Sequence, residues 1–285
     1  MKWEDLERSK NVEDLRMRSS ARGGGNLRSI LPIAQFLMKS KTGRVILLIG
    51  VVAYFFGFNP LALLDQSKNT QNIKSTAKND KEVAFVSAVL GQTEKVWHKL
   101  FAKHGARYKE PKLVLFRGSV RSGCGYANAQ TGPFYCPADQ KVYLDLGFFD
   151  ELKRRFHAPG DFAEAYVIAH EIGHHVQNQL GTLQKSHALQ ARSSKKTANK
   201  VQVKVELQAD CYAGVWAHYL DGILEKGDIQ EALNAASAIG DDTLQKETQG
   251  YVVPDSFTHG TSKQRASWFL RGYKSGKIGA CDTGI

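Results

Sequence analysis

The hydrophobic positions of this chain follow two different spacings. Apolar residues recur every three or four positions in five stretches, and this spacing predicts helices. The predicted helices cover residues 83–104, 161–180, 204–220, 228–240 and 263–273. The helix over 161–180 has the clearest boundaries, because Asp161 can cap its amino end and Gly181 can stop its carboxyl end.

Two short segments predict β-strands instead. Leu113–Phe116 is a run of residues typical of strands, and Lys141–Leu146 alternates polar and apolar positions as a half-buried strand does. The stretch between them contains several glycines and prolines, which indicates hairpins and loops. A polar, basic connection is expected from the end of the 161–180 helix to about Lys200.

A third pattern is a run without charged residues, Val45–Leu64. As a helix, these 20 residues would cover about 30 Å, which matches the hydrocarbon core of a bilayer. A buried core helix would show polar positions at helical spacing, and a cleaved signal peptide would not follow so long an amino-terminal region. We therefore predict a transmembrane helix over residues 45–64.

Basic residues predict the orientation of this helix. Lys39, Lys41 and Arg44 directly precede it, which by the positive-inside rule places the amino terminus in the cytoplasm, although lysines also follow it. We expect a single-pass inner-membrane protein whose main domain lies outside the cytoplasm. Its expected parts are a flexible basic tail (1–44), the membrane helix (45–64), a polar linker (65–80) and a folded domain (81–285).

Composition and charge exclude two other classes of protein. With 42% hydrophobic and 24% charged residues, the chain is not a disordered protein. Much of its net charge of +11 comes from residues 1–44, which hold ten Lys and Arg against five Asp and Glu. Aromatic residues do not interleave with these basic residues, so membrane topology and anionic lipid explain them better than nucleic acid. We expect no nucleic-acid partner.

The four cysteines fit an oxidising compartment. They allow three pairings, and the glycine-rich stretch between Cys124 and Cys136 can form a hairpin that closes a short loop. We therefore predict the disulfide Cys124–Cys136 and, by elimination, Cys211–Cys281. A zinc site made of these cysteines is disfavoured because the sequence has no Cys-x-x-Cys pair.

The segment His170-Glu171-Ile172-Gly173-His174 lies in the clearest predicted helix. Histidines four positions apart project from one helix face and can hold one zinc ion. Glu171 lies at the edge of that face, where it can act as the general base on a zinc-activated water. Gly173 inside a helix indicates the close approach of a substrate or a backbone, whereas His175 points away from the face.

A catalytic zinc site needs a third protein ligand. The predicted helix over 204–220 carries Glu206 and Asp210 on one face, together with the small residues Ala213 and Gly214. We expect Glu206 to bind zinc and Asp210 to orient one of the histidines through a hydrogen bond. Exchanged roles and a solvated acidic edge are the alternatives.

Hydrolysis also needs a group that stabilises the developing oxyanion. His259 precedes the last predicted helix and could donate a hydrogen bond to that oxyanion, and a capping role in its loop is the alternative. Arg265 is expected to be a structural residue or a partner for a substrate carboxylate. Three tyrosines are less favoured donors: Tyr166, Tyr212 and Tyr251.

From about Lys81 onward the chain resembles the bacterial neutral zinc metallopeptidases, a family of single-span membrane proteins. The matching segments are LVLFRGSVRSGCGYANAQTGPFYCPADQKVYLDLGFFDEL, GDFAEAYVIAHEIGHHVQ, VELQADCYAG and HGTSKQRASWFLRGY. The order His-Glu-x-x-His, then Glu-x-x-x-Asp, is also similar to that of thermolysin-like enzymes. This resemblance implies Glu206 as the third ligand, Asp210 as the residue that orients a histidine and His259 as a transition-state histidine. It further implies that KVYLDL (141–146) is an edge strand beside the cleft, or else a core strand.

These observations lead to one expected fold and three candidate functions. The fold is an α+β, zincin-like domain with an active-site helix, a small sheet and C-terminal helices, preceded by one transmembrane helix. The expected function is a membrane-anchored zinc endopeptidase acting on peptide or protein substrates. A zinc-binding envelope scaffold without proteolytic activity and a zinc amidase acting on a non-protein substrate are the alternatives.

Overall fold

The computed structural model describes residues 1–16 and 77–285. Met1–Arg16 and Ser75–Ile285 form one compact unit. Among the described residues, no helix is both long enough and apolar enough to cross a membrane. The helix predicted over residues 45–64 lies outside this part of the chain.

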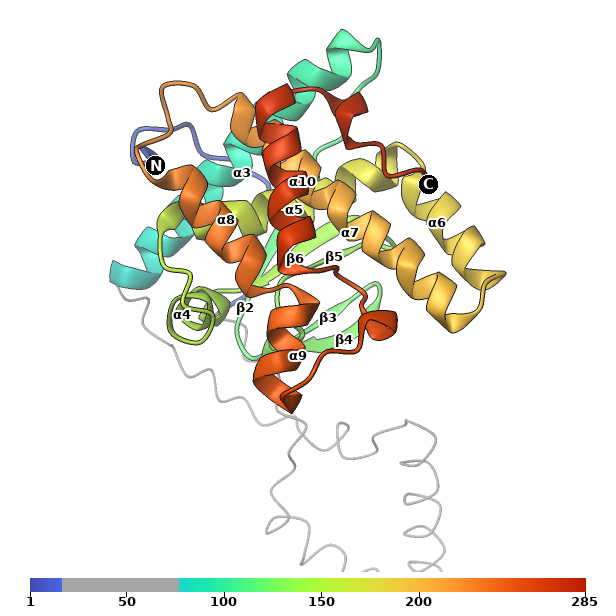
Figure 1. Cartoon of the computed structure of the whole chain (residues 1–285). Coiled ribbons are helices and arrows are strands. Elements are labelled where there is room, and N and C mark those ends of the chain that lie inside the picture. The colour runs from blue at the N-terminus through green and yellow to red at the C-terminus, as the bar shows by residue number, and fades with distance from the viewer. Residues whose placement is uncertain (17–76) are drawn as a thin grey trace, which may run out of the picture. The chain divides into compact units, whose positions relative to one another are not determined.

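The described unit is a mixed α+β structure in which helices predominate (Figure 1). Its helices are α3 (Ala77–Lys103), α4 (Gly147–Arg154), α5 (Asp161–Gln179), α6 (Thr182–Ala191), α7 (Lys195–His218), α8 (Asp228–Ala238), α9 (Asp241–Gln249) and α10 (Ser262–Ser275). Short 3-10 helices are η2 (Ala129–Thr131), η3 (Pro254–Ser256) and η4 (Ile278–Cys281). The α+β expectation is confirmed.

Two small sheets complete the unit. Strands β1 (Val12–Asp14), β2 (Lys112–Phe116), β6 (Lys141–Asp145) and β5 (Phe134–Cys136) form a four-stranded sheet in the order β1-β2-β6-β5. The first three are parallel, and β5 runs antiparallel to β6. Strands β3 (Ser119–Ser122) and β4 (Gly125–Asn128) form an antiparallel hairpin.

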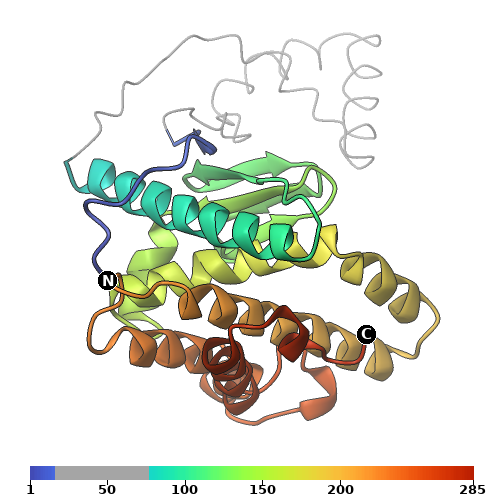
Figure 2. The ribbon, with the colours of Figure 1, turned by 90° about the horizontal axis from the view of Figure 1, so that it is seen from above.

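Helix α5 is the central element of this unit. It contacts α3, β5 and β6, and it also contacts α7 and α8. Figure 2 shows the sheet on one side of α5 and the helices α7, α8 and α10 on the other. Since α5 is covered from both sides, nearly all of its residues from Phe162 to Gln177 are buried.

Strand β6 is buried along most of its length rather than half-buried. Its residues Val142 and Leu144 join the main core, whereas Tyr143 joins a second core with Val114 and Phe116 of β2. This second core also includes Val120 and Ala127 of the β3–β4 hairpin. The two faces of β6 therefore pack against two different cores, because the β3–β4 hairpin covers the second face of the sheet.

The predicted helices are present at α3, α5, α7, α8 and α10, and the predicted strands at β2 and β6. The prediction of a connection that reaches to about Lys200 is wrong, because α6 and the first residues of α7 occupy most of this stretch. Ser194 caps α7 by accepting a hydrogen bond from the backbone N–H of Thr197. Both predicted disulfides, Cys124–Cys136 and Cys211–Cys281, are confirmed.

The expectation of a flexible tail before the folded domain needs correction for residues 1–16. Trp3 is buried and makes an edge contact with Phe85 of α3, with ring centroids 5.3 Å apart. The α-ammonium group of Met1 donates hydrogen bonds to Asp161 (2.8 Å) and Asp228 (3.3 Å). The few apolar residues of this segment show no period in the sequence, because each finds its partner elsewhere in the fold.

Helices α7 and α10 cross at two glycines. A Cβ atom at Gly214 would fall on the carbonyl oxygen of Phe269, and one at Gly272 would fall on the carbonyl oxygen of Cys211. The two backbones are thus in direct contact, which leaves no room for a side chain at either glycine.

We expect Gly272→Ala to destabilise the protein by about 1–3 kcal/mol, because the added methyl group must force α10 away from α7. The loss should appear as a lower midpoint of thermal unfolding measured by circular dichroism. Gly279→Ala is the matched control, since a Cβ atom there would meet nothing within 4 Å. Equal midpoints for the two variants would contradict this picture of the crossing.

Candidate metal centre

Helices α5 and α7 approach each other closely where they carry the predicted ligands. A Cβ atom at Gly173 would lie 2.9 Å from the carbonyl oxygen of Ala209. Because Gly173 has no side chain, the backbone of α7 can pack directly against α5. This close approach brings the histidines of α5 opposite Glu206 and Asp210 of α7.

Three donor atoms meet at this crossing. Glu206 Oε2 lies 3.2 Å from His170 Nε2 and 3.4 Å from His174 Nε2. Ligand atoms held about 2.0–2.1 Å from a tetrahedral zinc ion are themselves about 3.3 Å apart. The side chains of His170, His174 and Glu206 therefore fit one zinc ion, with His170 and Glu206 buried and His174 partly exposed.

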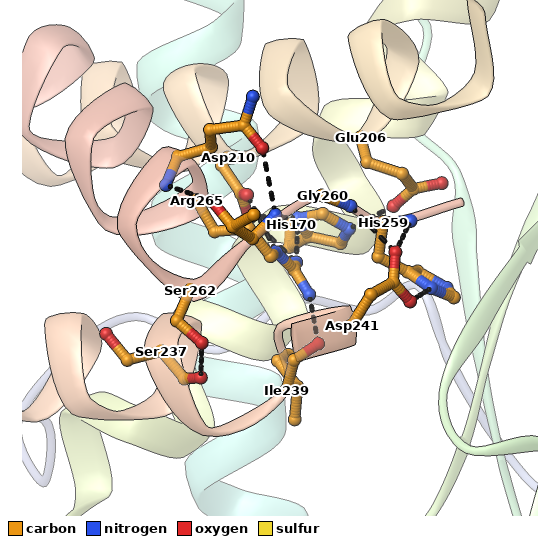
Figure 3. A network of polar contacts seen from close by, with 12 residues as sticks. His170, Glu206, Asp210, Ser237, Ile239, Asp241, His259, Gly260, Ser262 and Arg265 are labelled. Carbon is orange, nitrogen blue, oxygen red and sulfur yellow. Dashed lines mark hydrogen bonds and ion pairs between the residues drawn. The ribbon is translucent and has the colours of Figure 1, made fainter. Parts of the chain in front are cut away.

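Asp210 lies behind His170, at the nitrogen remote from the other donor atoms. His170 Nδ1 donates a hydrogen bond to Asp210 Oδ1 over 2.8 Å. Figure 3 shows Asp210 close to His170 and Arg265, and the Arg265 guanidinium donates to both carboxylate oxygens over 2.9 and 3.0 Å. Tyr166 donates a further hydrogen bond to Oδ1 over 2.5 Å. Arg265 thus holds Asp210 in the interior, and it also donates to the carbonyl oxygen of Ile239.

Two glutamines that the sequence analysis missed hold the other donors. His174 Nδ1 donates to Gln177 Oε1 over 2.8 Å, and the Gln177 amide donates to the carbonyl oxygen of Val205. Gln202 donates to Glu206 Oε1 over 2.8 Å, which leaves Oε2 for a metal ion. Helical spacing could have indicated both residues, because Gln177 follows His174 by three positions and Gln202 precedes Glu206 by four.

The charges of this cluster shift the pKa values of its members in opposite directions. Burial alone would lower the pKa of His170, but Asp210 and Glu206 outweigh it and raise the pKa to about 10. Burial alone would raise the pKa of Asp210, but Arg265 and His170 lower it to about 2. Glu206 also has a pKa well below its usual value, because burial is outweighed by His174 and His170. Both carboxylates are therefore ionised at neutral pH, whereas metal binding must displace a proton from His170, because only the neutral imidazole is a metal ligand.

A cavity of about 420 Å³ opens at the donor atoms. Its lining includes the three donors, together with Glu171 and His259. Glu171 is buried in α5 and His259 lies in the loop before α10. Tyr166 also lines the cavity, but its hydroxyl is bound to Asp210. Tyr212 and Tyr251 are not among the lining residues.

Asp241, at the first position of α9, holds the loop of His259. Its Oδ2 accepts hydrogen bonds from the backbone N–H groups of Thr258, His259 and Gly260, and its Oδ1 lies 3.1 Å from His259 Nδ1. The hydrogen bond with Asp241 raises the pKa of His259. His259 Nδ1 is thereby engaged, and the half-exposed imidazole can offer its Nε2–H to a ligand in the cavity.

The strand beside the cavity is β5 rather than the segment 141–146. Strand β6 lies between β2 and β5 and is therefore not an edge, whereas β5 is the terminal strand of the sheet. Phe134 and Tyr135 of β5 line the cavity. The sequence pattern of β5 is too short to be recognised, and its position at the edge depends on its antiparallel pairing with β6.

Helix α5 holds this edge strand through Tyr135. Asn178 donates to the Tyr135 hydroxyl over 2.9 Å, and that hydroxyl lies 3.1 Å from His175 Nδ1. His175 Nε2 lies 2.7 Å from the carbonyl oxygen of Lys109, and burial lowers the pKa of His175. A neutral His175 that accepts from Tyr135 and donates to Lys109 satisfies these contacts. One helix thus positions both the metal-binding histidines and the strand beside them.

Comparison with known proteins identifies the family. The sequence matches the family described as "Putative neutral zinc metallopeptidase" over residues 1–284. The chain belongs to this family. It is 47% identical over 288 residues to the uncharacterized protein YpfJ of Escherichia coli, an alignment that covers 99% of this chain and 98% of that protein.

An uncharacterized protein of Mycobacterium tuberculosis is 43% identical over 211 residues, which cover 70% of this chain and 69% of the relative. No solved structure matches the chain. The family description supports zinc-dependent peptidase as the class of activity.

We expect zinc affinity to separate ligands from orienting residues. Glu206→Ala removes a donor and should abolish stoichiometric zinc binding, whereas Asp210→Asn and Gln177→Leu should each weaken binding by about 10–100-fold. Competition with a chromophoric chelator measures these affinities on the purified protein. Gln230→Leu, an exposed glutamine of α8, is the control and should bind as the unaltered chain does. Unchanged affinity in Glu206→Ala would rule out the assigned third ligand.

Proposed function

We propose that the protein is a zinc-dependent endopeptidase that hydrolyses peptide bonds in the cavity between β5 and α7. The observation that carries this proposal is the convergence of three zinc donors, a separate carboxylate and a histidine on one cavity. Glu171 is not needed as a metal ligand, because Glu206 supplies the carboxylate of the donor set. It is therefore available for proton transfer.

In this proposal an extended substrate pairs with the outer edge of β5. Strand addition would fix the peptide by main-chain hydrogen bonds, with its scissile carbonyl toward the histidines of α5. Because Tyr135 ties β5 to α5, the substrate and the donor atoms would keep a constant relative position. Apolar lining residues such as Phe148, Val167 and Leu183 suit an apolar substrate side chain.

The chemical steps are assigned to two residues of the chain. Glu171 takes a proton from the attacking water and passes it to the leaving amine. His259, held by Asp241, donates a hydrogen bond from Nε2 to the carbonyl oxygen as negative charge develops there. Zinc bound by His170, His174 and Glu206 would supply Lewis acidity toward the carbonyl and the water.

Glu171→Gln tests the proposal directly. This variant keeps the size of the side chain but cannot accept a proton, so we expect peptide hydrolysis to fall by about 10²–10⁴-fold while zinc stays bound. Digestion of a peptide library followed by mass spectrometry measures cleavage, and metal analysis provides the control. Equal cleavage by the variant and the unaltered protein would refute the assigned base. If simple amides turn over and peptides do not, the amidase alternative is favoured.

The pair Asp241–His259 predicts a pH effect with a definite sign. If the protonated imidazole donates to the oxyanion, activity is lost as pH rises through the raised pKa of His259. Asp241→Asn removes the charge that raises this pKa, so the alkaline limb of the kcat profile should move to lower pH. His259→Ala should lower kcat by about 10²–10³-fold with a smaller change in KM. An alkaline limb that stays in place in Asp241→Asn would contradict the role of the pair.

A further inference from the structure

The segment Met1–Arg16 is built into the sheet of the metal-binding unit. Strand β1 pairs in parallel with β2, with Val12 opposite Leu113 and Asp14 opposite Leu115. The backbone N–H of Leu113 donates to the carbonyl oxygen of Asn11 over 2.9 Å. The backbone N–H of Leu15 donates to the carbonyl oxygen of Leu115 over 2.8 Å. Without β1, these polar groups of β2 would form an open sheet edge.

Ion pairs bind the same strand to its neighbours. Glu13 Oε1 lies 2.8 Å from Lys112 Nζ, and Glu13 Oε2 lies 2.9 Å from Lys141 Nζ. These two lysines, on β2 and β6, lower the pKa of Glu13. The carboxylate thus connects all three parallel strands of the sheet.

The preceding residues lie along α3, as Figure 2 also shows. The backbone N–H of Ser9 donates to the carbonyl oxygen of Ser87, and Ser87 Oγ donates back to the carbonyl oxygen of Ser9 over 2.8 Å. A Cβ atom at Gly91 would lie 2.7 Å from the carbonyl oxygen of Glu7. Trp3, near the start of the segment, belongs to the main hydrophobic core. Helix α3 is therefore shaped to receive this segment.

We propose that residues 1–16 and 77–285 lie in the same compartment, on one side of any membrane that the protein enters. Paired strands are about 4.8 Å apart, whereas a bilayer core is about 30 Å thick, so β1 and β2 cannot be separated by a membrane. One crossing between the two segments would place them on opposite sides. The topology expected from basic residues, with a cytoplasmic amino terminus and an external domain, is incompatible with this fold. The inference is independent of the proposed peptidase activity.

Basic residues in the sequence agree with a shared side. They precede the apolar run 45–64 at Lys39, Lys41 and Arg44, and lysines also follow it at Lys68, Lys74, Lys78 and Lys81. The positive-inside rule therefore does not require the two flanks to face different compartments.

Cysteine labelling of the full-length protein in intact spheroplasts tests the proposal. Lys10→Cys and Lys185→Cys each add one thiol at an exposed position, one in the amino-terminal segment and one in α6. The four native cysteines are all paired in disulfides. With a membrane-impermeant maleimide applied to spheroplasts, we expect both new thiols to be labelled, or both to be labelled only after lysis. Labelling of one thiol in intact spheroplasts and of the other only after lysis would overturn the inference.

A second experiment tests whether the segment is docked in the full-length chain. Gly91→Ala should displace residues 7–9 and increase hydrogen exchange of the backbone amides in Met1–Arg16. Inside a helix, alanine is otherwise more stabilising than glycine, so a lower unfolding midpoint would report the lost docking. Gly279→Ala is again the control. Unchanged exchange in Gly91→Ala would show that the segment is not held as proposed.

Discussion

The ionised carboxylate of Asp210 is the interaction on which the rest of the site depends. It lies in the interior and accepts hydrogen bonds from His170 of α5 and Arg265 of α10. A buried charge is tolerated only when it is paired and hydrogen-bonded, and breaking such a pair costs about 3–5 kcal/mol. Helices α5, α7 and α10 must therefore stay in one arrangement to satisfy this carboxylate. The same arrangement sets the ring of His170 so that Nε2 faces Glu206.

The close helix contacts make this network geometrically possible. Gly173 brings α5 against α7, and Gly214 and Gly272 bring α7 against α10. A larger residue at these positions would separate the helices and lengthen hydrogen bonds that tolerate only small displacements. Glycine costs stability inside a helix, and here that cost is offset by the close approach of polar partners.

The two histidines differ in the group that orients them. His170 donates to a carboxylate, whereas His174 donates to the neutral amide of Gln177. A carboxylate partner makes the imidazole a stronger base and metal donor than an amide does. Gln177 in turn binds Gln208, which donates to the carbonyl oxygen of Cys281. The Cys211–Cys281 disulfide therefore lies at the end of a hydrogen-bond chain that begins at His174.

The sequence by itself determined the features that depend on local spacing. The separation of His170 and His174, the pairing of Glu206 with Asp210 on one face and the major helices all follow from the helical repeat, because the relevant residues are neighbours along one element. Even the disulfide partners followed, since the loop between Cys124 and Cys136 is short. The tertiary structure alone decided which strand forms the sheet edge, how Asp241 holds His259, and that residues 1–16 belong to the domain. Each of these depends on contacts between separate elements, which leave no periodic signal in the sequence.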